Sequence, residues 1–201
     1  MDFQEKKSLY KVRETILEMI SDRGITIPES ENISFEEFSI KYNNKNLDIY
    51  INDELINKKI YVYFHNEVKN YSKGDLKNIM QKIISHYDDS DIGLILLLRD
   101  KENSAITKEL NKDLYKNVEV FLKKNMMFNI TKHEYVPKHS ILTKDEEKEL
   151  LEKYNTTKGK LPKISKTDPI AKYYGMKTDQ ICKIIRKSPE VGEYVYYRLV
   201  R

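Results

Sequence analysis

Apolar residues recur at helical spacing in the first part of the chain. The positions that match one face of a 3.6-residue helix are Leu9, Val12, Ile16, Met19 and Ile20. Asp22-Arg23-Gly24 then ends the pattern with a glycine, the residue that most readily takes the left-handed conformation after a helix. The pattern predicts an amphipathic helix over residues 3–23.

Two more helices are predicted in the first half, each after polar residues that suit a helix start. Ser34-x-x-Glu37 has the form of a capping box, in which each side chain bonds the backbone of the other residue, and it predicts a short helix through Tyr42. Ser72-x-x-Asp75 opens a longer helical pattern. The apolar face of that pattern carries Leu76, Ile79, Met80, Ile83 and Ile84.

Strand patterns lie between these helices. Leu47–Ile51 and Lys59–Phe64 are rich in β-branched and aromatic residues. Gly93–Leu98 is a near-continuous apolar run, which is typical of a central strand covered on both sides. A short helix to about Asn111 and an alternating strand at 118–122 complete the order α-β-β-α-β-α-β. We therefore expect a layered α/β domain on a mixed sheet.

The last third of the chain has its own helix signals. Thr143-x-x-Glu146 is a capping box for a helix whose inward face is predicted to be Leu150, Leu151 and Tyr154. Thr167 or Asp168 caps a shorter helix, with Pro169 in its first turn and Gly175 at its end. Two helices are thus expected before the final segment.

A hairpin is predicted at the C-terminus. Ile181–Arg186 and Tyr194–Val200 are strand-like and are separated by Ser, Pro and Gly. Alternation on the returning strand puts Tyr194, Tyr196 and Arg198 on one face and Tyr197 on the other. Two interpretations stay open: a binding surface of Tyr and Arg, or a core strand with tyrosine hydroxyls at its rim.

These elements predict an α+β protein of two domains. Residues 121–132 lack Pro and Gly, which indicates a short, ordered connection. We expect an N-terminal α/β domain with a mixed sheet at 1–130 and a small C-terminal α+β domain with a terminal hairpin at 131–201.

Composition narrows the function classes. The net charge is +4, yet residues 131–201 carry 16 Lys and Arg against 10 Asp and Glu, which leaves 20 against 22 in residues 1–130. This mild excess favours an acidic partner or nearby nucleic acid and falls short of a dedicated DNA-binding module.

No apolar run is long enough to span a membrane, and the N-terminus has no secretory signal pattern. A single cysteine excludes an internal disulfide and a cysteine-based zinc site.

Few residues suggest catalysis. His133 and His139 lie six apart around Pro137, which is not a metal-ligand spacing, and we expect structural histidines. Cys182 lies inside a strand pattern and is expected to be a small buried residue. The chain has no glycine-rich phosphate loop.

One carboxylate pattern resembles a nuclease site. Glu67-Val68-Lys69 follows a strand pattern, and Asp48 lies on the preceding one. Restriction-type nucleases use such a set to hold Mg²⁺ and orient water. The same pattern occurs by chance in lysine-rich chains.

A series of short motifs runs in unbroken order through the C-terminal residues: His133-Glu134-x-Val136-Pro137-Lys138-His139, Leu161-Pro162-x-Ile164, Asp168-Pro169-x-Ala171, Tyr174-Gly175, Ile184-Ile185-Arg186-Lys187-Ser188, Gly192-x-Tyr194 and Tyr197-Arg198. With these motifs the segment resembles the assembly domain of the RNA polymerase subunit 5 family (Rpb5), whose archaeal form is roughly this domain alone. The residues ahead of them suggest the longer form with an N-terminal jaw domain, found in eukaryotes and large DNA viruses.

The resemblance implies a non-catalytic subunit of a multisubunit DNA-directed RNA polymerase, without a cofactor. In that family the C-terminal domain docks on the largest subunit, and the jaw domain lies beside downstream DNA. The residues that the resemblance implies for shape and docking are Pro137, His139, Asp168, Pro169, Arg186, Tyr197 and Arg198. The jaw loop near DNA corresponds to a segment that includes Lys101, Ser104 and Ala105, and it keeps only the Ser-Ala of a Thr-Pro-Ser-Ala motif.

Two other hypotheses are retained: a Mg²⁺-dependent nuclease using Glu67 and Lys69, and a free-standing adaptor of the same shape. A polymerase subunit would act in the nucleus of a cell, or in the cytoplasm or virion of a large DNA virus.

Overall fold

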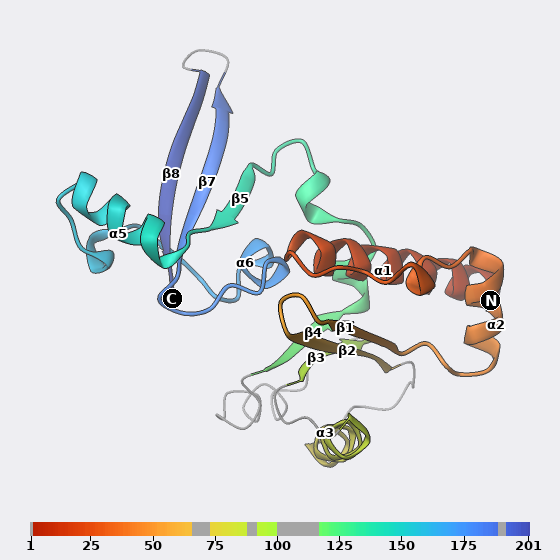
Figure 1. Ribbon diagram of the computed structural model, residues 1–201. Helices are drawn as coiled ribbons and strands as arrows, with labels where there is room; N and C mark the ends of the chain where they lie inside the picture. The colour runs from red at the N-terminus through yellow and green to blue at the C-terminus, as the bar shows by residue number, and fades with distance from the viewer. Residues whose placement is uncertain (1, 66–72, 88–91, 100–116, 189–191) are drawn as a thin grey trace. The chain divides into compact units, whose positions relative to one another are not determined.

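The computed structural model describes residues 2–65, 73–87, 92–99, 117–188 and 192–201 (Figure 1). The chain divides into two compact units, Met1–Phe128 and Asn129–Arg201. The described residues form a four-stranded sheet in each unit, together with helices, which confirms the predicted α+β fold class. No helix among these residues is long and apolar enough to cross a membrane.

The N-terminal unit begins with α1 (Asp2–Asp22), the helix predicted from apolar periodicity. The residues of its predicted face, each at most 2% exposed, are Leu9, Val12, Ile16, Met19 and Ile20. Gly24 follows with a φ of 80°, the left-handed conformation expected of a glycine that ends a helix. Arg13 of α1 is also buried, because its guanidinium pairs with the carboxylate of Glu31 in the turn η1 (Glu29–Glu31).

The next two helices confirm the predicted helix starts. α2 (Phe35–Asn43) has its capping box: the Glu37 N–H donates to Ser34 Oγ at 3.3 Å, and the Ser34 N–H donates to Glu37 Oε2 at 2.7 Å. α3 (Lys73–Tyr87) follows the second sheet strand, and Ile83 on its apolar face is buried.

The first sheet is mixed, as predicted. Its order is β1-β2-β3-β4, formed by β1 (Ile49–Asp53), β2 (Lys58–His65), β3 (Gly93–Leu98) and β4 (Val118–Leu122). β1 runs antiparallel to β2, whereas β3 is parallel to both β2 and β4, so the apolar run forms a central strand. β1 begins two residues later than predicted, because the Asp48 side chain accepts the Phe64 N–H at the strand end.

Helices cover both faces of this sheet (Figure 1). Ile83 of α3 packs in one cluster with alternate residues of the two central strands, Leu94, Leu96, Leu98, Val118 and Val120. Glu119 points to the opposite face, where Arg23 after α1 donates two hydrogen bonds to its carboxylate, at 2.9 and 2.7 Å. This pair fastens the end of α1 to β4.

A pair of 3₁₀ turns joins the two halves, η3 (Lys123–Met126) and η4 (Ile130–Lys132). The second sheet has the order β5-β7-β8-β6, formed by β5 (Lys138–Ile141), β7 (Ile181–Ser188), β8 (Gly192–Val200) and β6 (Lys163–Ile164). Its helices are α5 (Lys144–Lys153), α6 (Pro169–Tyr173) and the short turn η5 (Lys158–Lys160). The predicted terminal hairpin is confirmed, with antiparallel pairing from Ile181↔Leu199 to Ser188↔Gly192.

The inward face of α5 differs from the prediction at one position. Leu150 is buried, but Tyr154 is 58% exposed, because the helix ends at Lys153 and Tyr154 is its C-terminal cap. Glu147 lies on the buried face instead, with 8% of its surface exposed. The Tyr154 prediction was therefore wrong.

Several sequence predictions fall outside the described residues. They are the Glu67-Val68-Lys69 pattern, the short helix to about Asn111, and the loop residues Lys101, Ser104 and Ala105.

Candidate protein-binding surface

The register of the second sheet decides which of the predicted site residues share a face. Residues opposite each other in adjacent strands point to the same side of a sheet. His139 lies opposite Ile184 and Ile184 opposite Tyr196, while Cys182 lies opposite Arg198. Arg186, His139 and Arg198 therefore share one face with Tyr194 and Tyr196, and Tyr197 lies on the other.

α6 covers one end of that face. Asp168 is its N-terminal cap: Oδ1 accepts from the Ile170 N–H at 2.9 Å and from the Ala171 N–H at 3.4 Å. Pro169 occupies the first turn, where no amide donor is needed, and Gly175 ends the helix with a φ of 61°. The helix and the loop after it bury one core cluster against the sheet, formed by Ile164, Ala171, Met176, Cys182, Ile184 and Val200. Asp168 and Pro169 thus shape the unit.

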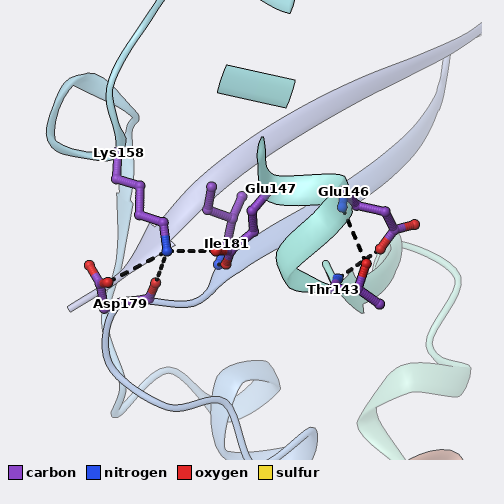
Figure 2. Close-up of polar contacts among 6 residues, drawn as sticks. All are labelled: Thr143, Glu146, Glu147, Lys158, Asp179 and Ile181. Atoms are coloured by element: carbon purple, nitrogen blue, oxygen red, sulfur yellow. Dashed lines mark hydrogen bonds and ion pairs between the residues drawn. The ribbon is translucent and has the colours of Figure 1, made fainter. Parts of the chain in front are cut away.

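α5 covers the same end of the opposite face, and a charged network fastens it there (Figure 2). Glu147 Oε1 accepts the Ile181 N–H at 3.0 Å, and Glu147 Oε2 lies 2.6 Å from Lys158 Nζ. Lys158 also donates to the Asp179 carbonyl at 2.9 Å. The hydrogen bond to Glu147 raises the pKa of Lys158 above its ordinary value.

Sequence reasoning missed this network. The sequence did hold a signal for it. Glu147 lies three residues before Leu150 and four before Leu151, a spacing that puts its side chain on the apolar face of α5.

His139 is held in place by its neighbour in the chain. It is 9% exposed, and its Nδ1 lies 2.7 Å from the Pro137 carbonyl, so that nitrogen carries the proton and donates. Burial lowers the pKa of His139, and this outweighs the hydrogen bond to the Pro137 carbonyl and the charge of Asp168, which both raise it; Arg186 and Arg198 lower it further. The imidazole is therefore neutral at pH 7 and fixes the start of β5, the structural role predicted from the sequence.

The described residues contain no group of three His, Cys, Asp or Glu side chains able to hold a metal ion. Cys182 is buried, and burial raises the pKa of its thiol to about 11. The thiol is protonated at neutral pH, which confirms the prediction of a small core residue.

Asp48, the carboxylate considered for a nuclease, is engaged within the first sheet. Its Oδ2 accepts from the Tyr61 hydroxyl at 2.7 Å and its Oδ1 from the Phe64 N–H at 3.1 Å. Burial raises its pKa. Its oxygens thus complete the hydrogen bonding at the ends of β1 and β2.

Beyond the part that α5 and α6 cover, the hairpin presents tyrosine and arginine. The Arg186 guanidinium lies 5.4 Å from the Tyr196 ring centroid, and the Tyr194 and Tyr196 rings meet edge to face at 4.9 Å. Tyr196 is 46% exposed. We call Arg186, Tyr194, Tyr196 and Arg198 the arginine–tyrosine face.

Arg198 and Tyr197 have structural contacts in addition. Arg198 Nη1 donates to the Lys163 carbonyl at 3.3 Å, which ties β8 to β6. Tyr197 packs against the cluster of Leu142, Leu150, Ile181 and Leu199 under α5. The structure therefore brings His139, Asp168, Arg186 and Arg198 together and separates Tyr197 from them. Tyr196, which alternation along β8 places on the same face as Tyr194 and Arg198, is more exposed than Tyr197.

Comparison with known proteins gives matches in both units. Residues 128–200 match the family model described as RNA polymerase Rpb5, C-terminal domain, and residues 4–83 match RNA polymerase Rpb5, N-terminal domain. The chain is 31% identical over 213 residues to the DNA-directed RNA polymerases I, II, and III subunit RPABC1 of Caenorhabditis elegans, covering 99% of this chain and 98% of the relative. It is 31% identical to the RPABC1 subunit of Dictyostelium discoideum, covering 95% and 96%. It is 33% identical to the DNA-directed RNA polymerase subunit 5-like protein 1 of Arabidopsis thaliana, covering 94% of each chain.

Proposed function

The chain belongs to the Rpb5 family of DNA-directed RNA polymerase subunits, and from that premise we propose that its C-terminal unit docks on the largest subunit of the enzyme. The observation that supports docking is the arginine–tyrosine face. On this face the Arg186 guanidinium stacks on the Tyr196 ring, and the Tyr194 and Tyr196 rings meet edge to face. The strands that carry these side chains pack against α5 and α6 at one end of the sheet. Tyr and Arg are the side chains most often found as anchors at protein interfaces.

The subunit is proposed to be non-catalytic. The titratable groups near the arginine–tyrosine face have structural tasks: His139 fixes β5, Cys182 fills the core and Asp168 caps α6. Nucleotide addition would then belong to the large subunits of the enzyme, and this chain would need no cofactor.

The N-terminal unit is proposed to lie beside downstream duplex DNA within the assembled enzyme. Residues 1–130 carry slightly more acidic than basic side chains, 22 against 20, so this part of the chain cannot hold DNA by phosphate neutralisation alone. Lys101, Ser104 and Ala105 would touch the backbone of a duplex that the other subunits have positioned. Such contacts place DNA without reading its sequence.

The named relatives are eukaryotic, and we place a cellular form of this chain in the nucleus; a form from a large DNA virus would act in the cytoplasm or virion.

Affinity purification of the tagged chain from its source tests the docking proposal. The wild type should co-purify with two much larger polypeptides. Tyr196→Ala should reduce their yield about tenfold or more, since an interface anchor contributes about 2 kcal/mol or more. Tyr135→Ala is the matched control, because Tyr135 is 84% exposed in the same unit and lies outside the arginine–tyrosine face. Purification without the large polypeptides would instead support the free-standing adaptor.

A further inference from the structure

The strand β8 has one edge that the described residues leave largely unpaired. β7 pairs with β8 along its whole length, from Gly192 to Leu199. On the other side, β6 pairs with β8 at Leu199 and Val200 alone, within the part of the chain that the structure describes. On that same side of β8, the segment from Glu193 to Tyr197 has no described strand beside it.

Two hydrogen bonds at the end of β8 fix which backbone groups point to that edge. The Leu199 N–H donates to the Pro162 carbonyl at 2.8 Å, on the β6 side, whereas the Val200 N–H donates to the Gln180 carbonyl at 2.9 Å, on the β7 side. Backbone groups alternate in direction along a strand, and the register with β7 is unbroken. The N–H and C=O groups of Val195 and Tyr197 therefore point outward, and those of Tyr194 and Tyr196 point to β7.

The sequence of this edge does not protect it. Natural edge strands avoid further pairing by proline, bulges or inward-pointing charges. Glu193–Tyr197 contains no proline, pairs regularly, and carries Tyr and Val after its one glutamate. These residues have high strand propensity, so the edge is suited to accept another strand.

The charges around the edge select the kind of strand. An added strand would lie beside β8, so its alternate side chains would face Tyr194, Tyr196 and Arg198. The Arg186 guanidinium of β7 reaches the same surface, because it lies over the Tyr196 ring. Lys187 and Glu193 lie on the opposite face at the turn end of the hairpin, with Nζ and Oε1 3.7 Å apart. On the opposite face the exposed apolar neighbour is Val195, which is 42% exposed. The complementary segment alternates acidic and apolar residues.

We propose that the outer edge of β8, from Glu193 to Tyr197, accepts an extended, acidic segment of the largest polymerase subunit as a fifth strand of the second sheet. This inference rests on the proposed docking and adds its mode: main-chain hydrogen bonds to Val195 and Tyr197 supply affinity, and the arginine–tyrosine face supplies selectivity.

Hydrogen exchange at single-residue resolution tests the alternation directly. In the free chain the Tyr194 and Tyr196 amides should exchange slowly, because they bond β7, and the Val195 and Tyr197 amides should exchange quickly. In the assembled polymerase the Val195 and Tyr197 amides should slow by tenfold or more. If the polymerase assembles but the Val195 and Tyr197 amides still exchange quickly, docking stands and the proposal of an added strand is refuted. Protection that instead rises with the concentration of the free chain would show a second copy at the edge, which also overturns it.

A proline variant gives a second test. Val195→Pro removes an outward N–H and leaves the bonds to β7, whereas Val195→Thr keeps the N–H and changes only the side chain. We expect Val195→Pro to lower co-purification of the large subunits about tenfold, and Val195→Thr to retain it. Normal assembly by a folded Val195→Pro protein would refute the inference. If this variant does not fold, the exchange measurement decides. Failure of the wild type to co-purify would refute the docking itself.

Discussion

Glu147 and Lys158 form an ion pair with 2.6 Å between Oε2 and Nζ, and the other oxygen of the same carboxylate accepts the Ile181 N–H. The pair joins α5 to η5 while its carboxylate also satisfies the first amide of β7. Its side chains are 11% and 29% exposed, so water supplies little compensation when one partner is removed.

Glu147→Ala should destabilise the C-terminal unit by about 2 kcal/mol or more, because it leaves the buried Ile181 amide without its acceptor and removes the closer of the two carboxylates that pair with Lys158. Denaturant unfolding of the full chain measures this. Glu149→Ala, at an exposed position of the same helix, should change stability by less than about 0.5 kcal/mol. Equal effects of the two changes would show that the network does not stabilise the unit.

The capping box of α5 should give a defined pH dependence. The Thr143 N–H and hydroxyl hold the pKa of Glu146 below its ordinary value of 4.5. The ionised form is therefore favoured in the folded state, and its contribution is complete above about pH 4.5 and lost as the pH falls through the lower folded value. Glu146→Gln should thus be less stable than wild type at pH 7, and the difference should shrink as the pH falls below 4.5. Urea midpoints across this range test it, and a difference independent of pH would contradict it.

The C-terminal unit should fold without the rest of the chain, provided that the fragment begins at Asn129. The Asn129 side chain donates to the Tyr173 hydroxyl at 2.8 Å and accepts the Thr131 N–H at 2.9 Å. Residues 129–201 should unfold cooperatively with modest stability, as expected for a small core. Residues 131–201 should be about 1 kcal/mol less stable, because a buried hydrogen bond is lost. Thermal melts of both fragments decide; the absence of a cooperative transition in the longer one would refute the prediction.

Arg186 and Arg198 should separate assembly from folding. Arg186→Ala removes a cation over Tyr196 at the far end of the hairpin, and we expect a clear loss of polymerase assembly with little change in melting temperature. Arg198→Ala also removes the hydrogen bond to Lys163, so it should lower stability by about 1 kcal/mol as well as assembly. Assembly should still fall more than folding. Normal assembly by both variants would count against the arginine–tyrosine face as the docking surface.

The free chain should bind duplex DNA weakly or not at all, because residues 1–130 carry no excess of positive charge. Within the polymerase, deletion of residues 101–105 should shorten the lifetime of the open complex and leave nucleotide addition unchanged. Duplex binding by the free chain at several salt concentrations, and open-complex decay with and without the loop, are the two measurements. Tight, salt-sensitive binding by the free chain or an unchanged lifetime would refute this role.

The sequence by itself determined the features whose partners lie a few residues apart. The capping boxes at Ser34 and Thr143, the cap at Asp168 and the glycine after α1 form as predicted, because each donor and acceptor belongs to one turn of chain. Gly93–Leu98 is a central strand because a run of apolar residues has to be covered on both faces.

Tertiary structure decided the features that need distant segments. Glu147 is buried because Lys158 and Ile181 meet it from later parts of the chain, and Arg13 is buried because Glu31 reaches it. The alternation of β8 separates Tyr196 from Tyr197 in the sequence, but it does not say which of the two lies under a helix. α5 packs over Tyr197, whereas α6 covers the other face only at one end of the sheet and leaves Tyr196 46% exposed. This packing decides the roles of the two tyrosines, since the two faces of a strand are equivalent until helices cover them.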